Sequence, residues 1–261
     1  MYKTILFDLN DKIATITFNR PESGNAFAKE SYSEIIHALK ECDLNNNIGA
    51  VIITGNGKHF SAGGDINRFK MLIETKQYIQ AESVRAAGET ALSIRSCSKP
   101  VIAMINGAAA GAGCSLALAC DFRIVSPLSK FLMAFIKLGL PGDTGGMYFL
   151  EKLVGIAKMT EMFLLGEAVN GEEALRIGLA TKLVEHDNLA HETRNFAKKL
   201  AYGPLAAFRK QKEIMSIFFY PELAKFIRAE AVNMVECSRT GDFAEAVDAF
   251  LHKRQAVFSG K

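Results

Sequence analysis

The sequence predicts an α/β fold that is followed by a helical C-terminal region. Over about the first 185 residues, short apolar runs rich in β-branched residues alternate with segments of helical periodicity. From Asp187 to the end the pattern is helical, with breaks near Gly203-Pro204 and Pro221. We therefore predict an α/β core at residues 1–185 and a helical region at residues 186–261.

The first part of the core is expected to be a β-hairpin followed by a helix and a strand. Residues 4–9 and 12–18 are apolar-rich and flank Asn10-Asp11, a typical turn pair. Apolar residues recur at helical spacing from about Ala28 to Leu44, and residues 50–54 read as a buried strand.

The later elements of the core alternate in the same way. Residues 67–98 predict helices with a polar break, and Lys99-Pro100 ends them. Leu150 to Leu165 predicts an apolar helix, and Asn170 is expected to cap the next one. Thr181 to Val184 predicts a short strand that ends the core.

The stretch from Val101 to Val125 organises the chain. Val101–Ile105 predicts a buried strand, 108–113 a loop of alanines and glycines, and Cys114–Cys120 a helix. Backbone N–H groups at a helix N-terminus lack partners, and small side chains let a ligand approach them closely. Such a loop can hold a phosphate, a carboxylate or an oxyanion. Close packing of a buried helix would also explain its composition.

A second loop of small residues, His59 to Asp65, follows the strand at 50–54 and precedes a predicted helix. Two such loops could place two backbone N–H donors around one point. A two-donor oxyanion hole is built in that way and needs no particular side chain.

Composition limits the other possibilities. Hydrophobic residues make up 49% of the 261 residues, and the net charge is +3, which argues against nucleic-acid binding but suits an anionic small substrate. The five cysteines form no CxxC pair, so we expect reduced thiols, no metal site and a cytoplasmic protein. No apolar run reaches the roughly 18 residues of a membrane helix, and the N-terminus has no signal-peptide pattern.

The segments HFSAGGDI and KPVIAMINGAAAGAGCSLALACDFRI resemble the two signature segments of the crotonase superfamily, the enoyl-CoA hydratase/isomerase group. NRPESGNAF and FLLGEAVNGEEALRIGLATKLV resemble the same family in the same order. The resemblance implies a core of ββα spiral turns and a helical C-terminal trimerisation region. It also implies an acyl-CoA substrate, with coenzyme A as part of the substrate and no separate cofactor, and a homotrimer or a homohexamer made of two trimers.

The resemblance also implies site residues. The oxyanion-hole donors would be the N–H groups of Gly64 and Ala112. Asp65 also suits the N-cap of a helix, which we rate above direct catalysis. Coenzyme A would be contacted by Asn25, Ala26, Ala62, Asp65, Ile66 and, from a neighbouring subunit, Lys253, with Met234 near the adenine.

The sequence departs from the hydratases of this family at both catalytic glutamates. Ser115 stands where they place one, and Phe135 stands near the other. The carboxylate that remains is Asp143, in the loop PGDTGG, where the family's isomerases and its 4-chlorobenzoyl-CoA dehalogenase also carry an acid. Apolar neighbours such as Phe131 should make Asp143 a stronger base. Its alternative role is the N-cap of the following helix.

These observations predict an enoyl-CoA isomerase that moves a Δ3 double bond to Δ2, with Asp143 as acid and base. A dehalogenase or thioester hydrolase would instead use Asp143 as a nucleophile or to assist water. A hydratase would need a carboxylate from elsewhere, such as Glu82 or Glu89. A protein of another class, a non-catalytic binder of CoA esters, would bind without turnover.

Overall fold

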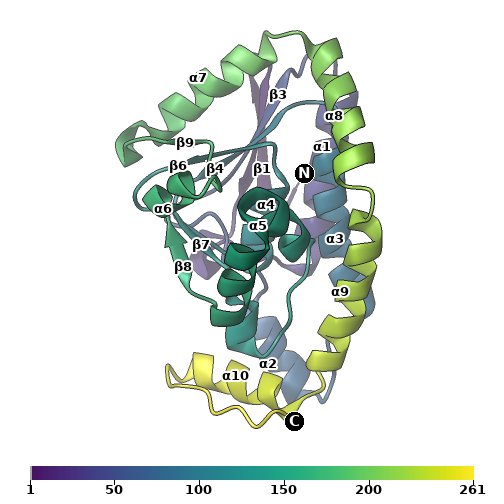
Figure 1. Ribbon diagram of the computed structural model, residues 1–261, viewed down its shortest axis with the longest axis vertical. Helices are drawn as coiled ribbons and strands as arrows, with labels where there is room; N and C mark the ends of the chain where they lie inside the picture. The colour runs from purple at the N-terminus through teal and green to yellow at the C-terminus, as the bar shows by residue number, and fades with distance from the viewer. Residues whose placement is uncertain (1) are drawn as a thin grey trace.

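A six-stranded sheet runs through the middle of the molecule in the computed structural model, which describes residues 2–261 (Figure 1). Its strands lie in the order β1-β2-β3-β4-β6-β9, and a smaller sheet has the order β5-β7-β8. The strands are β1 (Ile5–Asn10), β2 (Ile13–Phe18), β3 (Ala50–Gly55), β4 (Val101–Ile105), β5 (Ala108–Ala110), β6 (Phe122–Val125), β7 (Lys130–Leu132), β8 (Ala168–Asn170) and β9 (Lys182–Leu183). The predicted α/β class is confirmed.

Ten α-helices surround the sheets within residues 2–261. They are α1 (Lys29–Leu44), α2 (Ile66–Glu74), α3 (Ala81–Ser96), α4 (Ala112–Ala119), α5 (Gly146–Leu165), α6 (Gly171–Arg176), α7 (Leu189–Ala201), α8 (Leu205–Phe219), α9 (Leu223–Cys237) and α10 (Gly241–Leu251). Short 3₁₀ turns lie at Pro21–Ser23, Ala134–Leu138 and His186–Asn188. None of the helices in the described part of the chain is long and apolar enough to span a membrane.

The N-terminal hairpin forms as predicted, with its turn one residue later than Asn10-Asp11. Asn10 pairs with Ile13, so Asp11 and Lys12 form the two-residue turn. Both have positive φ angles, 53° and 61°, as the tight turns that match the twist of a hairpin require. From β2 onward the main sheet is parallel.

Side chains alternate between the two faces of the main sheet, and helices cover both faces. In β3, Val51 and Ile53 join the core beneath α1 and α3, whereas Ala50 and Ile52 join a second core beneath α7. A parallel sheet covered on both faces explains why all six residues of β3 are buried. Helix α7, from the predicted C-terminal region, therefore completes the layers of the α/β core.

The predicted loop of small residues at 108–113 contains a strand, so its interpretation as pure loop was wrong. Ala108–Ala110 pairs in parallel with Lys130–Leu132, and Leu132 pairs in turn with Ala168. Alanine has little strand propensity, and pairing with a neighbour overrode that preference. Helix α4 then begins at Ala112, two residues earlier than predicted.

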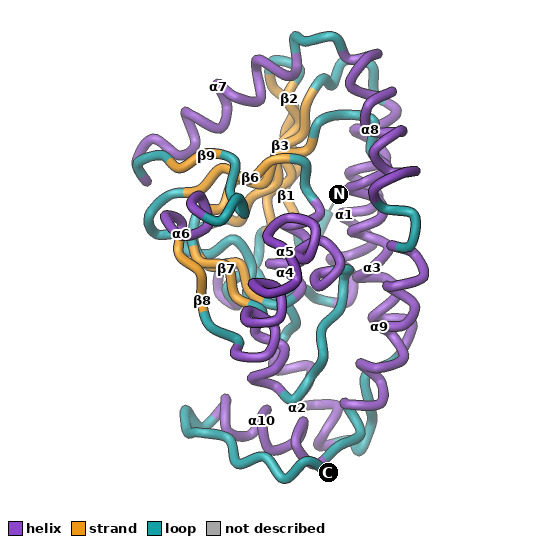
Figure 2. The backbone as a smooth tube through the Cα atoms, viewed as in Figure 1, coloured by secondary structure: helices purple, strands orange, loops and turns teal. Residues whose placement is uncertain are grey.

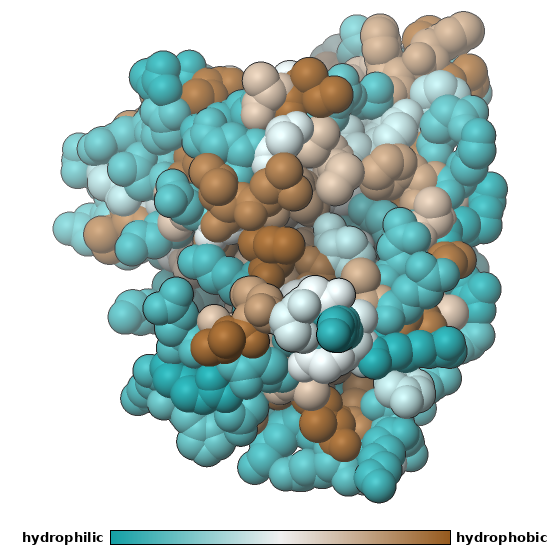
Figure 3. Space-filling view, turned by 60° about the horizontal axis from the view of Figure 1, so that its bottom comes forward, coloured by the Kyte–Doolittle hydropathy of each residue, from teal (hydrophilic) through white to brown (hydrophobic). Residues whose placement is uncertain are grey.

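The C-terminal helices form the outside of the molecule. Figure 2 shows α8 and α9 running down one side, and α10 lying at the end of the molecule beside α2. On the face drawn in Figure 3, hydrophobic side chains gather near the centre and hydrophilic residues surround them. Helix α10 also packs against the 3₁₀ turn at Ala134–Leu138, next to the proposed site.

Candidate active site

The two loops of small residues meet in the structure. The N–H of Ser61 donates to the carbonyl of Ala108 (3.1 Å), and the N–H of Ala110 donates to the carbonyl of Ser61 (2.8 Å). Gly63 has a φ of 83° and lies so close that a Cβ there would be 3.1 Å from the Ala112 nitrogen. Only glycine fits this left-handed conformation and this close approach.

Gly64 and Ala112, the two residues predicted to supply donors, line one cavity. Ala112 is the first residue of α4, so its N–H has no acceptor within the helix. Within residues 2–261, neither amide donates a hydrogen bond to a protein acceptor. Both remain free to bind a ligand oxygen.

Asp143 lies on the wall of the same cavity. It precedes α5 in a loop with three positive φ angles: 115° at Gly142, 63° at Thr144 and 73° at Gly145. Its carboxylate accepts a hydrogen bond from the Thr144 hydroxyl (2.7 Å) and caps no helix, because the N-cap of α5 is Gly145. The alternative prediction, that Asp143 is the cap of this helix, is therefore wrong.

The buried position of Asp143 changes its acidity. The residue is 8% exposed, and burial raises its pKa to about 6, although the Thr144 hydroxyl partly opposes the shift. Removing a carboxylate from water disfavours its charged form. At neutral pH the group is still mainly ionised, and it is a stronger base than an aspartate in water.

One aromatic side chain in the cavity wall belongs to a pair of packed rings. Phe69 of α2 stands above Gly64, where a Cβ would be 2.8 Å from the ring. Phe69 packs edge-to-face against Phe243 of α10, with ring centres 5.6 Å apart. The cavity has a volume of about 70 Å³, and Phe69 is one of the side chains that line it.

A comparison with known proteins agrees with this geometry. Residues 8–261 match the family model described as enoyl-CoA hydratase/isomerase. The chain belongs to the enoyl-CoA hydratase/isomerase family.

Individual relatives in this family carry different names. The chain is 31% identical to a trans-2-decenoyl-[acyl-carrier-protein] isomerase of Streptococcus mutans, over 100% of this chain and 99% of the relative. It is 36% identical to a probable enoyl-CoA hydratase of Rhodobacter capsulatus, over 100% and 99%. A solved enoyl-CoA hydratase of Mycobacterium avium subsp. paratuberculosis superposes with a TM-score of 0.90 at 29% identity, covering 98% of this chain and 99% of that one.

The two hydratase positions of the family hold no acid here. Ser115 is fully buried, and its hydroxyl donates to the carbonyl of Gly111 (3.3 Å) within α4. Phe135 lines the cavity and stacks on Phe163. Glu82 is exposed and paired with Arg85, and Glu89 is exposed; neither lines the cavity.

Three of the predicted coenzyme A residues lie near one another at the cavity. Ala62 and Asp65 line it, and Ile66 follows as the first residue of α2. Asp65 caps α2 by accepting from the Asn67 N–H (3.0 Å), which confirms its predicted structural role. Its carboxylate also pairs with Arg20 (3.1 Å).

Other predicted coenzyme A residues lie away from the cavity. Asn25 is 1% exposed, and its carboxamide is used within the protein, donating to the carbonyls of Asn56 and His59 and accepting from the Arg20 N–H. Its side chain therefore holds two loops together, and its contact with coenzyme A stays a prediction. Ala26 is buried beside it.

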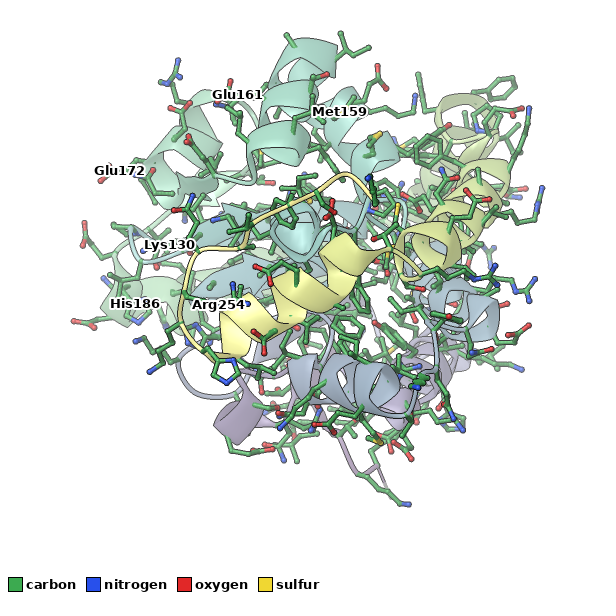
Figure 4. The ribbon with its side chains drawn as sticks, turned by 90° about the horizontal axis from the view of Figure 1, so that it is seen from below. Lys130, Met159, Glu161, Glu172, His186 and Arg254 are labelled. Atoms are coloured by element: carbon green, nitrogen blue, oxygen red, sulfur yellow. The ribbon has the colours of Figure 1, made fainter. Side chains whose placement is uncertain are left out.

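Two further residues were placed by resemblance. Lys253 is exposed and follows α10, next to Arg254, which Figure 4 labels beside that helix. Lys253 does not line the cavity of its own chain. Its contact with coenzyme A bound to a neighbouring subunit stays a prediction. Met234 of α9 does line the cavity.

The sequence analysis missed Glu230. It lies on the buried face of α9 with Ile227 and Met234 and is 8% exposed. Its Oε2 accepts a hydrogen bond from the Gly145 N–H (2.8 Å), two residues after Asp143. A glutamate on an otherwise apolar helical stripe was the signal that could have identified it. Residues 2–261 contain no group of three His, Cys, Asp or Glu side chains placed to hold a metal.

Proposed function

We propose that the protein moves the double bond of an enoyl-CoA from the Δ3 to the Δ2 position. The observation that carries this proposal is one buried carboxylate, Asp143, on the wall of a cavity that also holds two unpaired backbone N–H groups. An isomerase needs one base and a site for a developing oxyanion, and both are present.

In the proposed reaction the thioester oxygen lies between the N–H groups of Gly64 and Ala112. The Asp143 carboxylate removes a proton from the α carbon, and the electron pair of that C–H bond spreads into a dienolate. The negative charge on the oxygen is stabilised by the two amides. The Asp143 carboxylic acid then returns the proton to the γ carbon, which restores the thioester and leaves the enzyme unchanged.

The other activities of the family need groups that this cavity lacks. Water addition uses two carboxylates around one water molecule, and Ser115 and Phe135 stand at those positions. Hydrolysis through Asp143 is favoured by a histidine that activates water; none of the residues that line the cavity is a histidine. We therefore rank the hydratase and the dehalogenase or hydrolase activities below isomerisation, and a non-catalytic binder last.

The test is incubation of the purified protein with 3-enoyl-CoA and 2-enoyl-CoA thioesters of several chain lengths, followed by ultraviolet absorbance and mass spectrometry. We expect the 3-enoyl thioester to become conjugated with no change in mass. Gain of one water would indicate a hydratase instead. Binding of coenzyme A without turnover of any thioester would indicate a non-catalytic protein. The same incubation is carried out with enoyl thioesters of acyl-carrier protein, because their reacting group is the same.

Asp143→Asn is the decisive variant. It should abolish conversion and leave binding of the CoA ester intact, because the amide keeps the shape of the side chain and loses the base. Glu82→Gln is the matched control, since it neutralises an exposed carboxylate outside the cavity. Full activity of Asp143→Asn would sink the assignment.

We also propose that the protein is a cytoplasmic homotrimer or a hexamer of two trimers. Helix α8 supports an assembly, because its one buried side chain is Lys212 while Ile217, Phe218 and Phe219 are 57%, 71% and 59% exposed. Exposed apolar rows of this kind are typical of subunit interfaces. Light scattering should give the mass of three or six chains, and Phe218→Ser with Phe219→Ser should lower it.

A further inference from the structure

Two buried carboxyl groups lie at one short loop: Asp143 is part of the loop, and Glu230 binds the loop from helix α9. Asp143 lies in the loop, at the cavity wall, and Glu230 lies behind it on α9. Met234, one helical turn further along α9, lines the same cavity, so this face of the helix is directed toward the site. Each carboxyl group belongs to a residue that is 8% exposed.

Within residues 2–261, Glu230 is the one side chain outside the loop that forms a hydrogen bond with it. Thr144 and Gly145 both adopt left-handed φ angles, 63° and 73°, and Gly145 is the N-cap of α5. Thr144 is not glycine, so its conformation costs free energy that other contacts must offset. The hydrogen bond from the Gly145 N–H to Glu230 (2.8 Å) supplies such a contact.

We infer that Glu230 is a positioning residue for the Asp143 base. It holds the loop through the Gly145 amide, and its own carboxyl group stays protonated while Asp143 is ionised. The pair then carries a single negative charge, located on the group that faces the substrate. This inference rests on the proposed role of Asp143 as the base.

The surroundings favour this distribution of protons. Burial, followed by the charge of Asp143, raises the pKa of Glu230 to about 8, and the Gly145 N–H partly opposes the shift. Burial raises the pKa of Asp143 only to about 6. Between about pH 6 and about pH 8, the two carboxyl groups together hold one proton, and that proton is on Glu230. The charge of Asp143 is one cause of the raised pKa of Glu230, because two like charges in one buried region disfavour ionisation of both groups.

Other titratable groups around the pair do not change this order. Tyr32 of α1 lines the cavity, and burial together with the charge of Asp143 raises its pKa, so it stays neutral. Arg68 of α2 also lines the cavity, as a cation. On α3, which packs against α9, Glu82, Arg85 and Glu89 are exposed, and Arg95 is paired with Asp121.

The consequence is a loss of activity at alkaline pH. When Glu230 ionises, a second buried negative charge is added behind the loop that carries Asp143, and it opposes the charge of the forming dienolate. We expect kcat/KM for 3-enoyl-CoA to fall above about pH 8. Glu230→Gln keeps an oxygen that accepts from Gly145 but cannot ionise, so this fall should disappear while the rate near pH 7 stays within about threefold, because one hydrogen bond of similar geometry remains.

Glu230→Leu also removes the oxygen that accepts from the Gly145 N–H. Comparing it with Glu230→Gln separates the effect of holding the loop from the effect of the charge. We expect kcat to fall by up to about 100-fold, because a misplacement of about 1 Å in a catalytic group can cost about that much, with a smaller change in KM. Glu89→Gln, on the exposed face of α3, is the control and should match the parent protein. An unchanged alkaline fall in Glu230→Gln, or an unchanged kcat in Glu230→Leu, would overturn the inference.

A second measurement does not depend on turnover. The carboxyl ¹³C resonance of Glu230, assigned by its loss in Glu230→Gln, should titrate near pH 8 in the parent protein and lower in Asp143→Asn. Titration near pH 4, as in an unperturbed glutamate, would overturn the inference. If the parent protein isomerises nothing while Glu230 titrates near pH 8, the proposed function fails and the carboxyl pair stands.

Discussion

Ser115 of α4 and Gly146 of α5 pack in direct contact, and a Cβ atom on Gly146 would collide with the Ser115 hydroxyl. The two helices approach this closely because both residues are small. The family resemblance places a hydratase glutamate at the position of Ser115, and here Gly146 of the neighbouring helix lies against that position.

Ser115→Glu should therefore destabilise the protein without creating a hydratase. Overpacking a buried site costs about 1–3 kcal/mol of unfolding free energy, and an unpaired buried carboxylate adds to this. Thermal unfolding should show a lower Tm, and mass spectrometry should detect no water addition to 2-enoyl-CoA. Ser115→Ala, which loses one weak hydrogen bond, is the control. A stable Ser115→Glu protein that hydrates would contradict this explanation.

Ala112→Pro should remove one proposed oxyanion donor while helix α4 still forms. Ala112 is the first residue of α4, a position where proline is tolerated because its missing N–H has no helical acceptor. Loss of one such donor lowers kcat by roughly 10²- to 10³-fold. Ala112→Gly keeps the N–H and should keep the activity. Equal activity of the proline and glycine variants would show that this amide does not contact the reacting oxygen.

Phe69→Ala should widen the range of acyl chains that react. The ring lies against Gly64 and is one of the side chains that line the cavity of about 70 Å³. Its removal should raise kcat/KM for long-chain relative to four-carbon substrates, measured as a ratio across a chain-length series. Met71→Ala, an exposed position on the same helix, is the control and should leave the ratio unchanged.

Activity should fall on the acid side as Asp143 becomes protonated. Because burial raises the pKa of Asp143 to about 6, the rate should decline below that pH rather than near pH 4. The measurement is kcat/KM for 3-enoyl-CoA across a series of buffers at constant ionic strength. A decline of kcat/KM only near pH 4 would mean that water reaches Asp143 in the substrate-free enzyme.

Stability should fall as the pH rises from about 4 to about 8. Both Asp143 and Glu230 have a higher pKa when folded than when unfolded, so the folded state binds more protons in this window. Stability is then greatest below the unfolded values and declines through the folded ones. Asp143→Asn combined with Glu230→Gln should flatten this dependence and stabilise the protein at pH 8 by roughly 1–4 kcal/mol.

Chemical denaturation at several pH values measures this effect. Glu82→Gln combined with Glu89→Gln neutralises two exposed carboxyl groups and should follow the parent protein. A double variant that is no more stable than the parent at pH 8 would show that the buried pair is not strained by its charges.

Local pattern in the sequence determined most of the fold and part of the site. Alternating and helical periodicity located the strands and helices of the core because burial of one face imposes those periods. The family segments indicated Gly64, Ala112 and Asp143, and the structure places all three on one cavity. Cap residues could be predicted where the cap contacts only the next few residues. Asn170 is an example, because its side chain accepts from the Glu173 N–H.

Tertiary structure decided what depends on distant neighbours. The strand at Ala108–Ala110 exists because Lys130–Leu132 lies beside it, and alanines carry no local signal for that pairing. Asn25 became a loop anchor because its partners lie about thirty residues further along the chain. Glu230 binds the loop of Asp143 through the Gly145 N–H, although it lies 87 positions after Asp143 in the printed sequence. Which buried groups meet, and hence which one keeps a proton, is set by packing rather than by any short stretch of sequence.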